Sequence, residues 1–346
     1  MSRLNFGSLR KLVAPPDLAI DLGTANTRLC ARGHGLLVDE PTLIKFEAIT
    51  HAVEAYGLTA AKLASVDPQS FFFSPLHAGV VTDVEAAASL LKAFLTRFRT
   101  IGFMPQRALA CVPAELATVE NAALIEAAQQ AGLAEVATVP NLLAAAIGAG
   151  VDVASDYAHM VVNVGAGVTE AAVIRSGELL KTFSVRIACG DIHRAVSQNV
   201  ATRYGVLLFP REAERLTQEI GVANPLEETR EFITTGTDLL SGRSMCLCVT
   251  SDDVLFAAES VVDNLVDHLA AFIEKLPPDL ACEVIEDGIY LAGGGALLKG
   301  FAERLSWATQ FDVTIAYDPL RAVIRGAQEM LQVSAKTGMW SNVAVR

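Results

Sequence analysis

The chain has 346 residues, of which 52% are hydrophobic, and its formal net charge is −12. This length suffices for two domains with sizeable cores, and the negative charge argues against nonspecific binding to nucleic acid. No apolar run reaches the roughly 18–20 residues of a membrane-spanning helix, and no signal-type segment precedes Asp17. The six cysteines lack the spacing of a metal site, which favours a reduced, cytosolic protein. Cys246 and Cys248 alternate along one strand and are expected to be core thiols.

Residues 1–16 form a predicted N-terminal segment that precedes the first strand and ends at Pro15-Pro16. In a helical projection Phe6, Leu9 and Leu12 share an apolar face, whereas Leu4 lies nearer the polar side. The basic residues lie outside that face: Arg3, Arg10 and Lys11. A short basic amphipathic helix fits a membrane surface, so this segment is expected to bind the anionic inner membrane. A disordered or core-docked arm remains the alternative.

The stretch from Leu18 to Thr27 combines a buried strand with a polar turn, Leu-Ala-Ile-Asp-Leu-Gly-Thr-Ala-Asn-Thr. The strand at 17–20 and a second one from Thr27 predict a hairpin. The turn residues Gly23, Thr24, Ala25 and Asn26 bring backbone N–H groups and short side chains to one point, which suits a phosphate. Asp21 suits a metal on that phosphate, reached through water. By itself this hairpin is equally compatible with a structural turn.

Strands and helices alternate from here to residue 150, which predicts an α/β half. Residues 47–75 are less regular, a helix begins at Asp83 or Val84 and reaches Phe98, and strands at 106–112 and 134–139 flank a helix at 117–131. A small-residue helix follows at 142–149. The predicted loop at 100–105 carries Ile101, Phe103 and Met104 beside arginines, and apolar residues in such a loop are uncommon on a soluble surface. These residues are expected to contact a membrane, with packing on their own domain as the alternative.

The strand-turn pattern returns twice in the second half. Residues 160–170 read Met-Val-Val-Asn-Val-Gly-Ala-Gly-Val-Thr-Glu, and residues 288–298 lead a strand into three glycines. Two phosphate-type hairpins about 140 residues apart predict two similar halves that close on one nucleotide. The candidate ligand residues of the later motifs are Asn163, Gly165, Ala166, Gly167 and Val168, then Gly293, Gly294, Gly295, Ala296 and Leu297.

The three motifs resemble the two phosphate loops and the adenosine loop of the actin, Hsp70 and sugar-kinase superfamily. Within it the chain is most similar to the MreB family, the bacterial actins of cell shape. Further ordered matches run nearly end to end: Asp39-Glu40-Pro41, Gly79-Val80-Val81, residues 144–150, 184–187, 213–221 and 317–320.

The resemblance implies an α/β, actin-like fold of duplicated RNase H-like type, with two lobes and a nucleotide cleft. Lobe I would comprise residues 17–150 and 320–346 with a small subdomain at about 33–75. Lobe II would comprise residues 151–319 with a small subdomain at about 188–249.

The resemblance also implies ATP and Mg²⁺ as cofactors, with Asp21 facing the metal's water shell. Glu214 resembles the family's adenosine-side contact, and Arg215, Leu216 and Thr217 follow it on the same predicted helix. Thr217 stands where the family usually has a lysine.

Two family carboxylates are replaced by amides. Asn141 takes the place of the glutamate that positions the attacking water, and Asn163 takes the place of the metal-side aspartate. An amide has a similar shape but no charge and accepts no proton, so slow or absent ATP hydrolysis is expected. The alternative is that another acid, Glu170 or Asp83, substitutes.

The resemblance implies a cytoplasmic protein, peripheral on the inner face of the cytoplasmic membrane, that forms filaments directing cell shape and cell-wall elongation. Its implied partners are further copies of itself, with paired protofilaments left open, the anionic inner membrane, the cell-wall elongation machinery and an active MreB paralogue; no nucleic acid is expected. Two other readings stay open: a non-polymerising assembly protein of pilus-platform or FtsA type, and a small-molecule kinase of the same fold.

Overall fold

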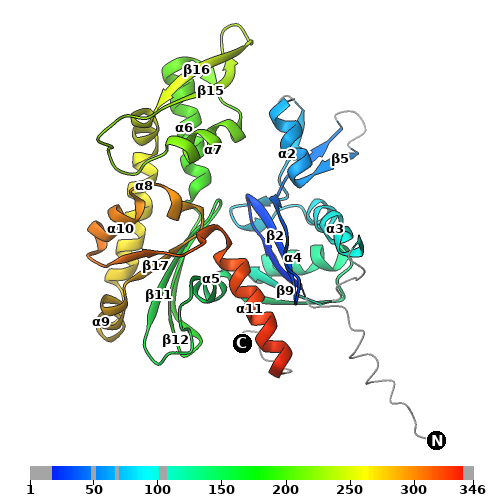
Figure 1. The fold of residues 1–346 in the computed structure, drawn as a ribbon, viewed down its shortest axis with the longest axis vertical. Helices are drawn as coiled ribbons and strands as arrows, with labels where there is room; N and C mark the ends of the chain where they lie inside the picture. The colour runs from blue at the N-terminus through cyan, green and yellow to red at the C-terminus, as the bar shows by residue number, and fades with distance from the viewer. Residues whose placement is uncertain (1–17, 48–51, 67–69, 101–106, 338–346) are drawn as a thin grey trace, which may run out of the picture.

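The structure is a computed structural model that describes residues 18–47, 52–66, 70–100 and 107–337 (Figure 1). The predicted membrane-binding positions lie outside these described residues: Leu4, Phe6, Leu9, Leu12, Ile101, Phe103 and Met104. Within the described ranges, no helix is both long enough and apolar enough to cross a membrane.

The first lobe is built on a five-stranded mixed sheet. Its strands are β1 (Leu18–Leu22), β2 (Asn26–Ala31), β3 (Gly35–Pro41), β9 (Arg107–Val112) and β10 (Glu135–Pro140), in the order β10-β9-β1-β2-β3. The first three strands form an antiparallel meander, and β1, β9 and β10 run parallel. Strand β1 is apolar on both faces because helices cover both of them.

The second lobe repeats this sheet with the same connectivity. Its strands are β11 (His159–Val164), β12 (Thr169–Arg175), β13 (Glu178–Val185), β17 (Ile289–Ala292) and β18 (Val313–Ile315), in the order β13-β12-β11-β17-β18. Again the first three strands are antiparallel, and β11, β17 and β18 are parallel. The hairpin β1-β2 is therefore equivalent to β11-β12, and the predicted pair of similar halves is confirmed.

Helices cover the outer face of each sheet with apolar side chains. In the first lobe α3 (Val84–Thr100) and α4 (Thr118–Gln130) share a core with β1, in which Phe94 is completely buried. In the second lobe the covering helices are α6 (Cys189–Tyr204), α7 (Pro210–Ile220), α8 (Ser251–Glu274), α9 (Pro278–Asp287) and α10 (Phe301–Thr309).

A crossed pair of helices fills the space between the two sheets (Figure 1). Helix α5 (Asn141–Ala149) follows β10, and α11 (Ala322–Thr337) follows β18 and the short helix η2 (Pro319–Arg321). A Cβ atom on Gly148 would lie 1.8 Å from the carbonyl oxygen of Ala322, and one on Gly326 would lie 1.8 Å from that of Ala144. The two helix backbones are thus in direct contact. Each helix contributes one glycine to this contact, so the two lobes contribute equivalent helices just as they contribute equivalent sheets.

Each lobe also carries a small sheet at its upper end (Figure 1). The first contains β4 (Ile44–Phe46), β5 (Val53–Tyr56) and β6 (Phe71–Phe73), with α2 (Gly57–Val66) beside it and the hairpin β7 (Leu76–His77)–β8 (Val80–Val81) following. The second contains β14 (Val206–Leu207), β15 (Glu231–Asp238) and β16 (Ser244–Thr250). Strand β3 belongs to the main sheet and α6 to the main core, although both fall inside the predicted subdomain ranges. The domain boundaries themselves stay a prediction.

The expectation that Cys246 and Cys248 are core thiols is wrong, because both side chains are exposed. Leu247 and Val249, the alternating residues of β16, face the core instead.

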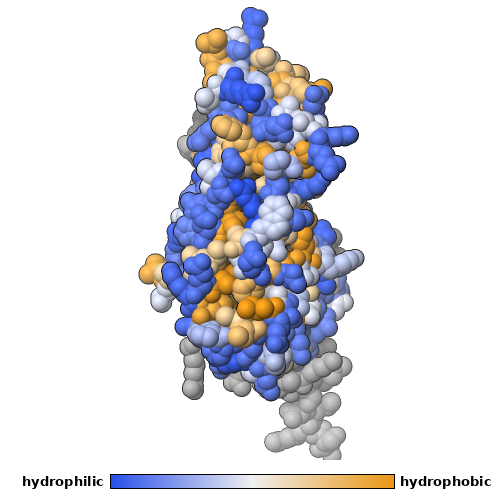
Figure 2. All heavy atoms as spheres, turned by 90° about the vertical axis from the view of Figure 1, so that its left-hand side faces the viewer, coloured by the Kyte–Doolittle hydropathy of each residue, from blue (hydrophilic) through white to orange (hydrophobic). Residues whose placement is uncertain are grey.

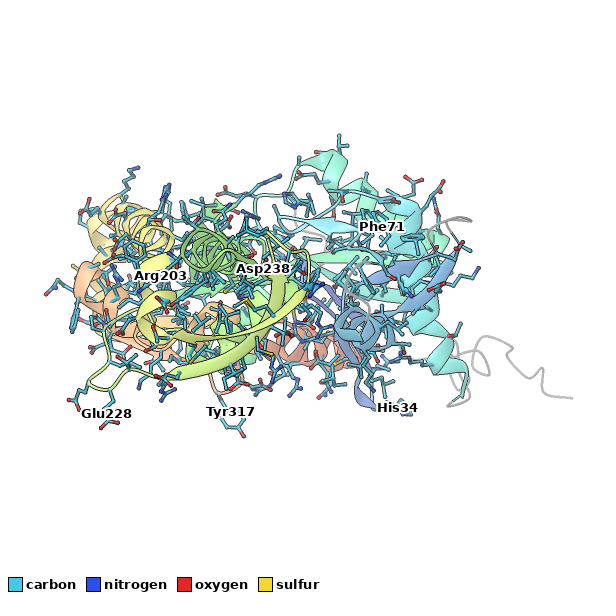
Figure 3. All side chains as sticks on the ribbon, turned by 90° about the horizontal axis from the view of Figure 1, so that it is seen from above. His34, Phe71, Arg203, Glu228, Asp238 and Tyr317 are labelled. Carbon is cyan, nitrogen blue, oxygen red and sulfur yellow. The ribbon has the colours of Figure 1, made fainter. Side chains whose placement is uncertain are left out.

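Seen from above, Arg203 and Asp238 lie on the second lobe and Phe71 on the first (Figure 3).

The outer face of the second lobe combines polar surface with hydrophobic patches in its lower part (Figure 2). Three large apolar side chains of helices α8, α9 and α10 are exposed: Phe256, Ile285 and Trp307. Exposed apolar patches of this kind are typical of protein contact surfaces.

Candidate functional site

The first predicted phosphate turn, between β1 and β2, is closed by its own backbone. The N–H of Gly23 donates to the carbonyl of Asn26 at 3.1 Å, and a Cβ atom on Gly23 would lie 2.8 Å from that oxygen. The turn is braced by Thr42, whose hydroxyl donates to the carbonyl of Gly23 at 2.7 Å and lies 2.8 Å from the hydroxyl of Thr27. No local pattern points to Thr42, because it reaches the turn only through the pairing of β2 with β3.

The second predicted turn, between β11 and β12, has the same construction. The N–H of Gly165 donates to the carbonyl of Val168 at 3.0 Å, and a Cβ atom on Gly165 would lie 2.9 Å from that oxygen. The start of α6 holds the turn from outside, since the N–H of Gly190 donates to the carbonyl of Ala166 at 2.9 Å. Equivalent strands thus carry equivalent turns, as the recurring sequence motif predicts.

The two turns meet at Thr24 and Gly167. A Cβ atom on Gly167 would lie 2.5 Å from the Thr24 hydroxyl oxygen and 3.0 Å from the backbone nitrogen of Gly79. The Gly79 N–H in turn donates to the Thr24 hydroxyl at 2.9 Å. Any side chain at position 167 would push the two lobes apart at this point, so glycine is required there.

The third loop, at the end of β17, packs directly against the second turn. Gly293 has φ +83°, and a Cβ atom on it would lie 2.3 Å from the carbonyl oxygen of Val164 and 2.7 Å from Oδ1 of Asn163. A Cβ atom on Gly295 would strike the Val164 side chain at 2.3 Å, whereas one on Gly294 meets nothing closer than 3.7 Å. Ala296 is buried and Leu297 is exposed. The predicted residues of all three motifs are therefore gathered where the lobes meet.

Asp21 is paired with an arginine that no motif singled out. Asp21 and Arg28 lie opposite each other across β1-β2, and Nη1 of Arg28 is 3.4 Å from Oδ2 of Asp21. Arg28 Nε also lies 2.9 Å from Asp39 Oδ1, and Arg321 contacts the other Asp39 oxygen at 2.7 Å. Burial raises the pKa of Asp21, and the Arg28 guanidinium offsets part of that rise.

The equivalent pair in the second lobe is Asn163 and Glu170, opposite each other across β11-β12. Glu170 is completely buried; it accepts the N–H of Ala114 at 2.7 Å and the side-chain amide of Asn141 at 3.2 Å. Burial raises the pKa of Glu170 to about 7, although these two hydrogen bonds lower it. Asn141 therefore serves as a hydrogen-bond donor to a buried acid. Asp83, the other alternative acid, caps α3 by accepting the N–H of Ala86 at 2.9 Å.

The donor set around the turns does not match a divalent cation held directly by protein carboxylates. Asp21 is engaged by Arg28, position 163 carries an uncharged amide, and Glu170 is enclosed. Nowhere in the described ranges do three or more histidine, cysteine, aspartate or glutamate side chains form a group that could hold a metal. Hard divalent cations require several oxygen ligands, so most of them would have to come from phosphate and water.

Helix α7 presents its four predicted contact residues in different directions. Leu216 is buried in the core of the second lobe, and buried Thr217 donates its hydroxyl to the carbonyl of Ala213 at 2.9 Å. Arg215 lies over the ring of Phe232 at 5.2 Å. Glu214 is half-buried, and burial raises the pKa of its carboxyl. Glu214 is therefore the one acidic side chain among these four, and it keeps some exposed surface with which it could contact a ligand.

The family model described as MreB/Mbl protein matches residues 15–338. The chain belongs to the MreB/Mbl family. It is 35% identical over 324 residues to the cell shape-determining protein MreB of Escherichia coli K12, covering 92% of this chain and 93% of that protein. It is 30% identical over 317 residues to the cell shape-determining protein Mbl of Bacillus subtilis 168, covering 91% and 95%.

Solved structures agree with this membership. The crystal structure of Spiroplasma citri MreB5 bound to ADP matches with a TM-score of 0.87 and 26% identity, covering 95% of this chain and 99% of that one. The MamK double helical filament matches with a TM-score of 0.72 at 18% identity, covering 91% and 99%, and shows likeness of fold alone. The expectation of an actin-like fold, as in MreB, is confirmed.

Proposed function

We propose that this chain is an ATP-binding, actin-like subunit that polymerises into membrane-associated filaments directing cell shape and cell-wall elongation. The curated relatives carry the description cell shape-determining, related MreB5 structures contain ADP or AMPPNP, and the MamK structure is a filament. The protein's partners would be further copies of itself, the anionic inner membrane and the elongation machinery, with an active paralogue as a further candidate. It would act in the cytoplasm, on the inner face of the membrane.

The observation that carries the nucleotide assignment is the meeting of two glycine-closed turns with a glycine-rich third loop. Backbone N–H groups of two such turns converge on an anion without any basic side chain. ATP, arriving as its magnesium complex, would place its phosphates against the two turns at residues 23–26 and 165–168, and its base between Glu214 and Gly294. Gly294→Trp would fill the open side of the third loop, and we expect it to abolish ATP binding in calorimetric titration. Ser260→Trp on the exposed side of α8 is the matched control.

ATP hydrolysis by this site would be slow, because neither Asn141 nor Glu170 can activate water. The Asn141 amide carries no basic group, and the Glu170 carboxyl has no exposed surface through which water could reach it. Loss of a base or water-positioning group typically costs about 10²–10⁴-fold in rate. Filaments would therefore keep their nucleotide and turn over slowly, or depend on the active paralogue.

Phosphate release should be measured for the wild type, for Asn141→Glu with Asn163→Asp, and for Asn141→Gln as the uncharged control. The new carboxyl at position 141 would face Glu170, so the two acids should share one proton and gain activity only above about neutral pH. We expect the double variant to hydrolyse at least tenfold faster than the wild type. Wild-type hydrolysis that the double variant cannot raise would overturn the proposal of a slow site.

Membrane attachment is proposed for residues 1–16 with Ile101, Phe103 and Met104. Partial burial of four or five apolar side chains is worth only a few kcal/mol per subunit, at roughly 25 cal/mol per Å². Attachment should therefore be firm only when a filament presents many copies. In vesicle sedimentation with ATP and anionic lipid, deletion of residues 2–12 should abolish pelleting. Equal pelleting of the truncated and full chains would refute this attachment.

A further inference from the structure

Within the described part of the chain, Arg28 is the guanidinium that pairs with Asp21, the acid of the first phosphate turn. Its side chain is only 11% exposed, and Nη1 lies 3.4 Å from Asp21, whose side chain is 14% exposed. Asp21 and Arg28 face the same side of the sheet because they are opposite each other in the β1-β2 ladder. The positive charge is therefore fixed against Asp21, the acid that precedes the turn formed by residues 23–26.

A chain of ion pairs holds Arg28 in this position. Arg28 contacts Asp39 at 2.9 Å, Asp39 contacts Arg321 at 2.7 Å, and Arg321 contacts Asp318 at 3.5 Å. Arg321 lies in η2, the short helix whose Pro319 carbonyl accepts the N–H of Gly293 in the third loop at 2.9 Å. The guanidinium thus cannot swing into solvent without breaking two ion pairs.

The acids near the turns therefore repel a bare triphosphate less than free carboxylates would. Asp21 shares the Arg28 guanidinium with Asp39, position 163 carries an amide, and Glu170 is enclosed by two hydrogen-bond donors. In a site with free carboxylates, a divalent cation binds together with ATP because it screens the repulsion between carboxylate and phosphate. Here Arg28 reduces that repulsion, and Asp21, the carboxylate that would hold the cation's water shell, is already paired with it.

We propose that Arg28 takes over the charge-neutralising role of the divalent cation, so that this site binds adenine nucleotides with nearly the same affinity with and without Mg²⁺. The inference rests on the proposed function as a nucleotide-binding subunit. By linkage, it also means that binding to the protein leaves the nucleotide's own affinity for Mg²⁺ nearly unchanged.

Calorimetric titration of the full chain with ATP, and with ADP, in Mg²⁺ and in EDTA tests this directly. For the wild type we expect the two dissociation constants to differ by less than about fivefold. Arg28→Leu frees Asp21, so affinity in EDTA should fall. The Mg²⁺ ratio, which is the dissociation constant in EDTA divided by that in Mg²⁺, should then rise to about tenfold or more. Arg28→Lys retains the charge and should keep the ratio near that of the wild type.

Arg175→Leu is the matched control, because it removes an arginine from an ion pair with Glu283 that is not part of the Arg28 network. Its Mg²⁺ ratio should equal that of the wild type. If Arg28→Leu does not fold, Asn163→Asp restores a carboxylate in the second lobe and should raise the ratio by itself.

A wild-type affinity that falls more than about tenfold in EDTA would overturn the inference while leaving the proposed function standing. An unchanged ratio in both Arg28→Leu and Asn163→Asp would overturn it as well. Absence of nucleotide binding by the wild type in both buffers would instead refute the proposed function, and the inference with it.

Discussion

The crossing of α5 and α11 offers a sharp test of how the two lobes are joined. Gly326→Ala adds one methyl group that would lie 1.8 Å from the Ala144 carbonyl oxygen and 2.9 Å from the Gly148 nitrogen. Both obstacles are backbone atoms, so no side chain can rotate away. Gly148→Ala makes the same collision from the other helix, against the carbonyl of Ala322.

The expected cost follows from the separation that the methyl group requires. A carbon–oxygen contact needs about 3.3 Å, so the helices must move apart by roughly 1.5 Å. A gap of 0.5–1 Å already forfeits about a quarter to a half of the dispersion energy of each contact across it. Overpacking usually costs about 1–3 kcal/mol, and alanine returns at most about 1 kcal/mol in helix propensity. Because two backbones collide, the cost lies at the upper end of that range, and we expect each variant to lose about 2 kcal/mol net in free energy of unfolding.

Urea denaturation followed by circular dichroism measures this loss. Ser260→Ala on the exposed side of α8 is the control for helix propensity, and it should match or slightly exceed the wild type. The double variant should lose less than the sum of the single losses, since one separation accommodates both methyl groups. A Gly326→Ala protein within about 0.5 kcal/mol of the wild type would refute the close backbone crossing.

Two further predictions concern single groups. Glu170 has a pKa raised from 4.5 to about 7 by burial, so the folded state holds a proton that the unfolded chain releases. Stability should therefore fall by up to roughly 3 kcal/mol as pH rises from 4.5 to 7 and level off above, and Glu170→Gln should flatten that slope in denaturation at several pH values; an equal slope in both proteins would exclude Glu170 as its source. Native thiol titration with a maleimide should label the exposed cysteines rapidly and leave Cys30 and Cys111 unmodified until the chain is unfolded; rapid native labelling of Cys111 would contradict its burial. The exposed cysteines are Cys246, Cys248 and Cys282.

The amino-acid sequence by itself identifies the three loops and the alternation of strands and helices. Glycine and other small residues after an apolar strand favour a turn, because glycine adopts backbone conformations and close approaches that larger residues cannot, so the turns at Gly23 and Gly165 follow from local rules. The sequence also shows that positions 141 and 163 carry the amides Asn141 and Asn163, because the identity of a residue is known without the fold. The ordered family matches then predict the duplicated, actin-like architecture that the two equivalent sheets confirm.

The partners of those residues were decided only by the tertiary structure. Arg28 meets Asp21 through the register of a hairpin and is held by Arg321, which lies 282 residues from Asp39. Asn141 meets Glu170 because a helix of one lobe starts against a strand of the other. Cys246 faces solvent since period-two alternation gives two faces without saying which one is buried. Such contacts depend on how whole helices and strands pack, whereas a local sequence pattern determines only which side chains each element carries.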